Sequence, residues 1–318
     1  MEESKLTKDS GSEQSAWERG LEAWREKCIA GLAGPYGWWS LTCLAWLEDG
    51  PNALGSGGDC AVLLDQRFPP VVATLRLTRD RLTIEPAGTA VLKVGDEVVA
   101  APTTVEEGCT LIVRGPITAH VELVRRGGSW AARVRDPLMA SAKDPTKDVA
   151  WFPPDPTWVL EAAFAPAEPG EEVAVSNVLG QVSMQPVAGR LTFAWGGAEH
   201  TLLATHGSDG GLFVSFRDAS NKAPDDPSGR LATYSGGRYL NTGAPVDGRV
   251  VLDFNRAIHP PCAHTPYATC PVPTPGNALP FAVPVGEANP HPELVVVPSR
   301  LGSLTPTFEA GGLGLLGR

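Results

Sequence analysis

Apolar and polar positions alternate over short distances along most of the chain. From about residue 52 the apolar stretches are brief, and Gly, Pro or Asp separates them at intervals of about eight to twelve residues. Leu75 and Leu77, then Leu82 and Ile84, alternate with polar residues in the way that half-buried strands do. The pattern predicts a mainly β fold of short antiparallel strands, packed as a sandwich or barrel.

A helical spacing of apolar residues is found near the start of the chain. Ser15 is a candidate N-cap, and Glu18 three residues later completes a capping box. The apolar residues that follow recur at helical spacing: Trp17, Leu21, Trp24 and Cys28. We therefore predict an N-terminal helix that begins at Ser15 and docks on the β domains.

Breaks in the strand pattern divide the chain. Residues 134–156 are rich in proline and charge, and a second series of short apolar stretches follows them. The end of the chain is rich in Pro, Gly and Ser. We predict five segments: a polar segment and helix (1–32), a β-sandwich (33–136), a linker (137–156), a second antiparallel β domain (157–287) and a Pro/Gly-rich tail (288–318).

The charge of the chain argues against two classes of partner. The formal net charge is −10, and no stretch gathers Lys and Arg as a nucleic-acid backbone or an anionic membrane surface requires. Residues 1–15 lack the basic and apolar regions of a secretion signal, and no apolar run approaches a membrane span. We expect a cytoplasmic protein with a small-molecule ligand, and its oligomeric state stays open.

One loop gathers most of the side chains that carry chemistry. Residues 253–277 hold two cysteines, two histidines and six prolines. Thiolates and imidazoles at H-x2-C-x-H-x5-C spacing suit zinc or another transition metal, with His259, Cys262, His264 and Cys270 as ligands. The same cysteines are close enough in sequence for a disulfide, and Cys262 beside a histidine is a candidate nucleophile. The loop alone leaves these alternatives open.

A second hypothesis for the same region is acid–base chemistry without a metal. On an alternating strand Asp253 and Asn255 point to one face, where buried polar groups need each other or a ligand. We predict His259 as general acid or base, and Arg238 as an anion clamp. The candidate catalytic residues are His259, Asp253, Tyr234 and Cys262, and the candidate substrate-binding residues are Arg238, Arg217, Asn255 and Asn277. The alternative is a buried hydrogen-bond network that holds the loop on the sheet.

Several stretches resemble a known family. FVSFRD (213–218), TYSGGRYL (233–240), VVLDFNRAIHPPCAHTPYATCPVPTPGN (250–277) and VGE (285–287) are similar in content and order to the DUF1684 family, and the resemblance extends over roughly residues 17–287. The family is named for its unknown function, so the resemblance implies no reaction. Where its members commonly carry Tyr-Asn-Pro and Glu-Asn-Arg-Leu, this chain has 258–260 as Ile-His-Pro and 276–279 as Gly-Asn-Ala-Leu.

The first β region more loosely resembles a forkhead-associated sandwich. Phosphothreonine binding in such domains relies on an Arg after the first loop glycine and on a Ser-x-x-His loop. Here Ser56 follows Gly55, and no Ser-x-x-His comes after it. The resemblance therefore implies the sandwich and argues against phosphopeptide binding.

The sequence as a whole favours a metal-independent cytoplasmic enzyme that acts on a small polar molecule, with specialised metabolism among its settings. No motif for a redox cofactor is visible, which favours hydrolysis, elimination, isomerisation or cyclisation. The alternatives are a noncatalytic β protein that binds a ligand or partner, and a metal-binding loop. The substrate, the reaction and the state of the Cys262 and Cys270 thiols are beyond what the residues decide.

Overall fold

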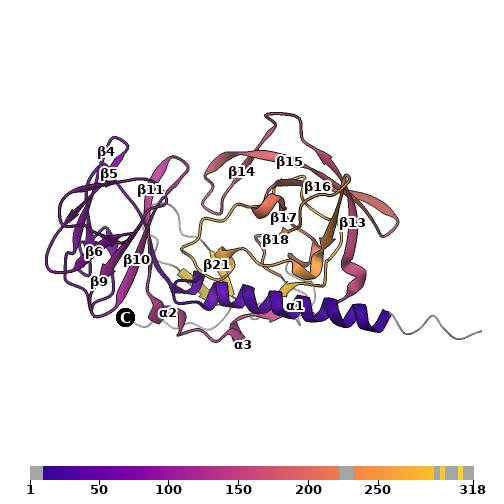
Figure 1. The fold of residues 1–318 in the computed structure, drawn as a ribbon, viewed down its shortest axis with the longest axis horizontal. Helices are drawn as coiled ribbons and strands as arrows, with labels where there is room; N and C mark the ends of the chain where they lie inside the picture. The colour runs from indigo at the N-terminus through magenta and orange to yellow at the C-terminus, as the bar shows by residue number, and fades with distance from the viewer. Residues whose placement is uncertain (1–9, 222–232, 290–293, 298–306, 311–318) are drawn as a thin grey trace, which may run out of the picture.

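The structure, a computed structural model, describes residues 10–221, 233–289, 294–297 and 307–310. Its strands form two neighbouring β units, and helix α1 (Ser10–Ala33) runs along one edge of both (Figure 1). The predicted mainly β fold is confirmed. No helix within the described ranges combines the length and the apolar character needed to cross a membrane.

The first β unit packs two sheets around one core. One sheet has the strand order β1-β11-β10-β9-β6-β7 and the other the order β3-β2-β4-β5-β8. Leu75, Leu82 and Ile84 are fully buried between them, as their alternation with polar residues predicts. The finer resemblance to a forkhead-associated sandwich stays a prediction. The strands are β1 (Leu41–Trp46), β2 (Gly50–Gly55), β3 (Val62–Leu63), β4 (Ala73–Thr78), β5 (Arg81–Pro86), β6 (Val91–Val94), β7 (Glu97–Val98), β8 (Thr103–Val105), β9 (Thr110–Arg114), β10 (Thr118–Arg126) and β11 (Ser129–Arg135).

The second β unit is built on one antiparallel sheet. Its order is β18-β17-β16-β15-β13-β19, with β14 paired to β15. Phe216, Leu252 and Phe254 are fully buried on the face that forms the core of this unit. The strands are β13 (Val159–Pro166), β14 (Glu172–Ser176), β15 (Val182–Trp195), β16 (Ala198–His206), β17 (Leu212–Phe216), β18 (Arg238–Asn241) and β19 (Arg249–Asp253). After β19 the chain leaves the sheet through two short 3-10 turns, η5 (Phe254–Arg256) and η6 (Pro261–Ala263). The next strand along the chain is β20 (Glu287–Ala288).

The segment between the units is ordered by three Asp-Pro pairs. Asp136, Asp144 and Asp155 each accept a hydrogen bond from a backbone N–H two residues later, and a proline occupies the first helical position. These caps begin α2 (Pro137–Ala140), α3 (Pro145–Asp148) and η2 (Pro156–Trp158). Between α3 and η2, the two-residue strand β12 (Ala150–Trp151) pairs with β20. The segment predicted as a linker therefore contributes directly to the region around residue 287.

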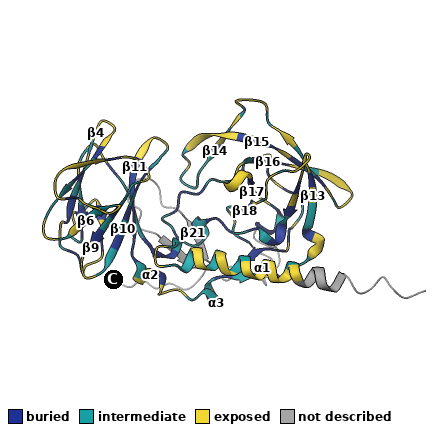
Figure 2. Cartoon of the chain, in the orientation of Figure 1, coloured by how far each residue is buried: buried dark blue, intermediate teal, exposed yellow. Residues whose placement is uncertain are grey.

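Helix α1 is present, but its predicted start at Ser15 is wrong. The helix begins at Ser10, so Ser15 lies inside it. Most of its described residues are exposed, whereas Leu21 is buried against the body of the protein (Figure 2). The Trp17 indole donates to Asp253, and Arg25 donates to the backbone carbonyl of Phe152. These two contacts attach α1 to the end of β19 and to the residue that follows β12.

The predicted tail lies largely outside the described residues. Within it the structure describes the end of β20 and two paired strands, β21 (Leu294–Val297) and β22 (Thr307–Ala310).

Candidate functional site

A buried carboxylate, that of Glu287, is the centre of the candidate site. Gly286 precedes it with φ +83, and a Cβ there would lie 2.5 Å from the carbonyl oxygen of Ala257. Only glycine fits this close approach and this backbone conformation without strain. The Glu287 backbone N–H donates to the same carbonyl, and Trp151 is its partner across the β12–β20 pair. The local backbone therefore holds Glu287 in one position, with 2% of the residue exposed.

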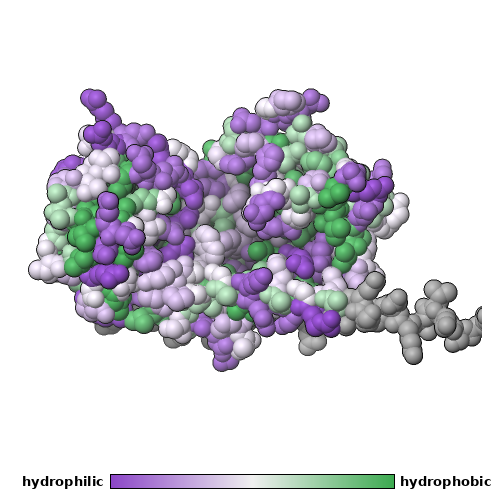
Figure 3. Space-filling view, viewed as in Figure 1, coloured by the Kyte–Doolittle hydropathy of each residue, from purple (hydrophilic) through white to green (hydrophobic). Residues whose placement is uncertain are grey.

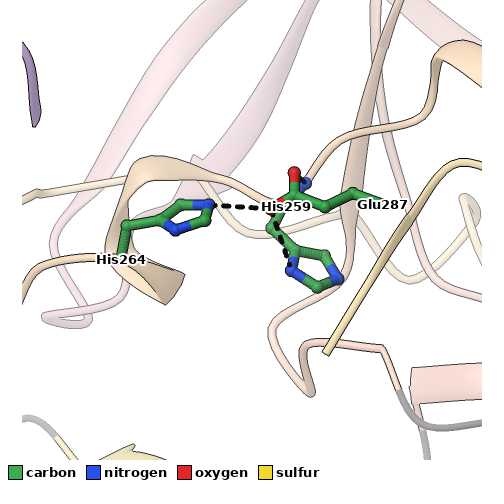
Figure 4. A group of neighbouring side chains, drawn as sticks. All are labelled: His259, His264 and Glu287. Carbon is green, nitrogen blue, oxygen red and sulfur yellow. Dashed lines mark hydrogen bonds and ion pairs between the residues drawn. The ribbon is translucent and has the colours of Figure 1, made fainter. Parts of the chain in front are cut away.

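Two histidines from the predicted loop converge on this carboxylate (Figure 4). The backbone N–H of His259 donates to Glu287 Oε2 at 2.8 Å, and Nδ1 of its ring lies 3.5 Å from Oε1. Nε2 of His264, which follows η6, lies 3.0 Å from the same Oε1. The three side chains each offer one ligand atom within 4.8 Å of the others.

The protonation of His259 follows from its other contact. Its Nε2 accepts a hydrogen bond of 3.2 Å from the backbone N–H of Tyr234. The neutral ring therefore carries its proton on Nδ1, which faces Glu287. Burial lowers the pKa of His259 to about 4, against the opposing effect of the Glu287 charge. His259 is thus a neutral histidine at pH 7, with Nε2 hydrogen-bonded and Nδ1 facing Glu287 at 3.5 Å.

Glu287 is the ionised member of the group. Burial by itself raises the pKa of a carboxyl, but the two histidines and the backbone N–H of His259 outweigh burial here. The pKa of Glu287 is accordingly lowered from its ordinary value. A single negative charge stands between two imidazole rings.

His264 differs from His259 in having one ring nitrogen without a partner. Its Nε2 and Glu287 Oε1 are close, yet they lack hydrogen-bond alignment, and neither buried atom has another partner. Across the described residues no hydrogen bond reaches His264 Nδ1, and 6% of the His264 side chain is exposed. His264 is only partly buried as a residue. The His264 ring therefore contacts the buried carboxylate with one nitrogen and has the other nitrogen unused.

Aromatic rings and a lysine surround His264. The Trp39 ring centroid lies 6.4 Å from that of His264, and Lys143 Nζ lies 5.4 Å from the Trp39 centroid. Lys143 also donates to the backbone carbonyl of His264 at 2.8 Å, and burial lowers its pKa. The indole N–H groups of Trp39 and of Trp151 are buried without a hydrogen-bond partner. The site thus combines a carboxylate, an imidazole and unused donors.

Arg238, predicted as an anion clamp, is saturated by the protein itself. Its side chain and that of Asp218 are both 0% exposed and lie 2.6 Å apart. Its remaining donors reach the backbone carbonyls of Val283 and Val285. Arg238 therefore holds the stretch that leads into Glu287, and with its side chain 0% exposed it is closed to a substrate.

The structure disperses the other predicted polar residues. Asp253 accepts from Trp17 and Arg256 at the base of α1. The Asn255 side chain bonds the backbone of residue 155 and donates to Asp253 Oδ1 at 3.0 Å, as one of the two predicted alternatives requires. The Asn277 side chain bonds the backbone of residues 203 and 215. Arg217 is exposed. Of the predicted catalytic and substrate-binding set, the structure brings His259 to Glu287, and the Tyr234 backbone N–H donates to His259.

The two cysteines form a group of their own. Cys262 and Cys270 are free thiols in an apolar cluster with Tyr239, and the Cys262 backbone N–H donates to Cys270 Sγ at 3.2 Å. The hydrogen bond with Cys270 and burial raise the pKa of Cys262, so it is not poised as a nucleophilic thiolate. The predicted set of four metal ligands therefore does not converge. Among the described residues the converging set is His259, His264 and Glu287.

Glu287 is the functional residue that the sequence analysis missed. It stands in the quoted stretch Val285-Gly286-Glu287, where an acid follows glycine between apolar residues. That signal marks a constrained acid, but it names no partner.

Comparisons with known proteins match part of the chain to a family. Residues 146–288 match the family described as protein of unknown function (DUF1684). The match confirms the predicted resemblance over the second β unit and the segment that leads into it, and the resemblance of residues 17–145 stays a prediction. A solution NMR structure of an uncharacterised protein of Haloarcula marismortui is 29% identical, covering 44% of this chain and 76% of its own, with a TM-score of 0.34. No curated protein matches the chain.

Proposed function

We propose that the chain is an enzyme that moves a proton on a small polar molecule, with His264 as general base and Glu287 as the carboxylate that orients it. The observation that carries the proposal is the contact of 3.0 Å between His264 Nε2 and the buried Glu287, which leaves Nδ1 of the same ring without a hydrogen-bond partner in the described structure. A carboxylate beside one imidazole nitrogen places the ring proton there, so the lone pair is on the other nitrogen.

The chemistry follows from this arrangement. His264 Nδ1 takes a proton from the substrate, and the ionised Glu287 stabilises the imidazolium that forms. The neutral His259 and the backbone of Tyr234 act as positioning groups that keep Glu287 in place. The partnerless indole N–H of Trp39 is a donor for an oxygen of the substrate. Hydrolysis, elimination, isomerisation and cyclisation all use such a base.

A first experiment needs no substrate. Two-dimensional ¹H–¹⁵N NMR of the histidine rings reports which nitrogen of His264 carries the proton. We expect Nε2–H in the wild type and a mixture of tautomers in Glu287→Gln, where the anionic acceptor is gone. A His264 protonated at Nδ1, or a tautomer indifferent to Glu287, rejects the proposal.

A second experiment tests turnover. The protein is incubated in D₂O with a panel of 2-oxo acids, hydroxy acids and lactones, and ¹H NMR follows C–H exchange, loss of water and ring opening. Turnover should disappear in His264→Ala and persist in His206→Ala, whose histidine is exposed at the end of β16. Turnover that survives His264→Ala contradicts the role of His264, and binding without turnover supports the noncatalytic alternative.

A divalent transition metal is the second candidate, because three suitable donor atoms converge and two of them are buried without aligned hydrogen bonds. Two imidazoles and a carboxylate are a known zinc set. The N–H of Tyr234 opposes it, since a metal at His259 Nδ1 requires a proton on Nε2, where a donor already points. Titration with Zn²⁺ and Co²⁺ separates the two proposals: tight binding lost in His264→Ala and Glu287→Gln favours the metal.

The cytoplasm remains our proposed compartment. It is supported by the thiol state of the six cysteines, all of which are free, as a reducing compartment keeps them.

A further inference from the structure

A buried arginine without a counter-ion lies between the two β units. Arg133 of β11 is 5% exposed, and no ion pair with a carboxylate is found for it among the described residues. Its one side-chain hydrogen bond goes to a neutral group, the hydroxyl of Thr269, at 2.7 Å. Its Nε is buried with no hydrogen-bond partner. An arginine this deeply buried is normally paired, because an uncompensated buried charge is costly.

The neighbouring carboxylate is already engaged. Glu122 is the register partner of Arg133 across β10 and β11. Its two oxygens nevertheless accept from Arg135, at 2.8 Å and 3.3 Å. Arg126 also lies on the same face of the sheet, two residues from Val124, and its charge acts on Arg133. This face therefore carries more positive than negative charge, centred on Arg133.

The second unit covers this face without neutralising it. Tyr267 packs on Leu44, Val124 and Ala131 beside Arg133, and Thr269 follows from the same loop. The Trp38 ring lies between two guanidinium groups, 5.8 Å from that of Arg133 and 5.2 Å from that of Arg135. Figure 3 shows the molecule hollowed between the two units. An aromatic face reduces the free-energy cost of burying a guanidinium charge, but it does not hydrogen-bond the N–H donors of Arg133.

We infer that Arg133 anchors a site between the two β units for an oxyanion, the carboxylate or phosphate group of a small ligand. The planar guanidinium matches both groups, and the Thr269 hydroxyl adds a second donor beside it. Nη1 is the atom that meets the ligand first, since it has no hydrogen bond in the described structure and is not among the buried atoms. The inference is independent of the proposed function, because none of these residues belongs to the His264–Glu287 group.

Binding of simple anions tests the site. Isothermal titration at constant ionic strength uses sodium phosphate and sodium succinate as probes, with sodium chloride as the blank. We expect phosphate or succinate to bind the wild type and to lose about tenfold or more in affinity in Arg133→Met. Arg76→Met is the matched control, because Arg76 is an exposed arginine paired with Glu85 on the opposite sheet of the same unit. Binding of phosphate alone assigns a phosphate ligand, and binding of succinate alone assigns a carboxylate.

Two further measurements keep the test decisive if Arg133→Met does not fold. Thr269→Val preserves the shape of its side chain and should weaken the same anion several-fold. In the wild type, the Arg133 Nε–H resonance should shift on addition of the binding anion and not of chloride. The inference is overturned if neither anion binds, if Thr269→Val binds as the wild type does, or if the Nε–H signal does not respond.

Discussion

The backbone N–H of Tyr234 donates to Nε2 of His259, and this one contact decides the chemistry of the ring. The accepting nitrogen carries no proton, so the proton of the neutral ring lies on Nδ1 and faces Glu287. One nitrogen of the His259 ring therefore accepts from Tyr234, and the other faces Glu287. This is why we propose His264, the neighbouring ring that shares the same carboxylate, as the general base in place of His259.

His259 should make the stability of the protein depend on pH. The pKa of His259 is about 4 in the folded protein, against an ordinary value of 6.5. Between these two pH values the unfolded chain binds a proton at His259 and the folded protein does not. Stability present above pH 6.5 is lost as the pH falls toward 4, by about 3 kcal/mol in full. Urea unfolding at pH 7.5, 5.5 and 4.5 should show this loss in the wild type and a smaller one in His259→Asn.

The control for this prediction is His206→Asn, which changes an exposed histidine. It should leave the pH dependence of the wild type intact. Equal slopes in the wild type and in His259→Asn would show that the His259 ring has the same pKa in the folded and the unfolded protein.

Breaking the ion pair of Arg238 and Asp218 should lower the free energy of unfolding strongly. Arg238→Met leaves Asp218 buried without its partner and frees the carbonyls that precede Glu287. We expect a loss of about 3–5 kcal/mol in the free energy of unfolding, measured by urea titration. Arg249→Met, which breaks an exposed pair with Glu161, should cost less than about 1 kcal/mol. A similar small cost for both variants contradicts the buried pair.

The fold was predictable where the pattern has a period. Leu75, Leu82 and Ile84 are buried as their alternation predicts, and Leu21 is buried as the helical spacing predicts. The start of α1 was missed because residues 10–15 are polar and carry no apolar stripe, so the signal begins only at Trp17. A helix can extend beyond the face it buries, and the pattern then ends before the helix does.

The candidate site was predictable only in part. The loop at 253–277 does supply both histidines, but their common partner Glu287 is fixed by a two-residue strand, too short to show any alternation. The role of Arg238 was equally hidden, because nothing in the sequence says that Asp218 will be buried beside it. Whether a polar residue faces a ligand or only stabilises the fold depends on its neighbours in space. Residue types alone do not specify those neighbours.

The attachment of α1 should depend on one indole. Trp17→Phe keeps the aromatic ring and removes the N–H that donates to Asp253 at 3.2 Å. We expect a loss of about 1 kcal/mol and faster hydrogen exchange in α1, with the amides of β16 unchanged. Trp46→Phe is a comparison variant in the first unit, where the indole makes no hydrogen bond in the described structure. Unchanged exchange in α1 would mean that packing alone holds the helix.

The thiols of Cys262 and Cys270 should be present and unreactive. The pKa of Cys262 is raised, whereas the hydrogen bond with Cys262 lowers the pKa of Cys270, so burial is what protects Cys270 from a reagent. Burial together with the Glu287 charge raises the pKa of Cys28 to about 11. An aromatic disulfide reagent should therefore modify Cys60 in the native protein well before these three, as peptide mapping would show. After unfolding without reductant, all six cysteines should titrate. A count of four, with Cys262 and Cys270 linked, would replace the free thiols by a disulfide and remove the support that they give to a reducing compartment.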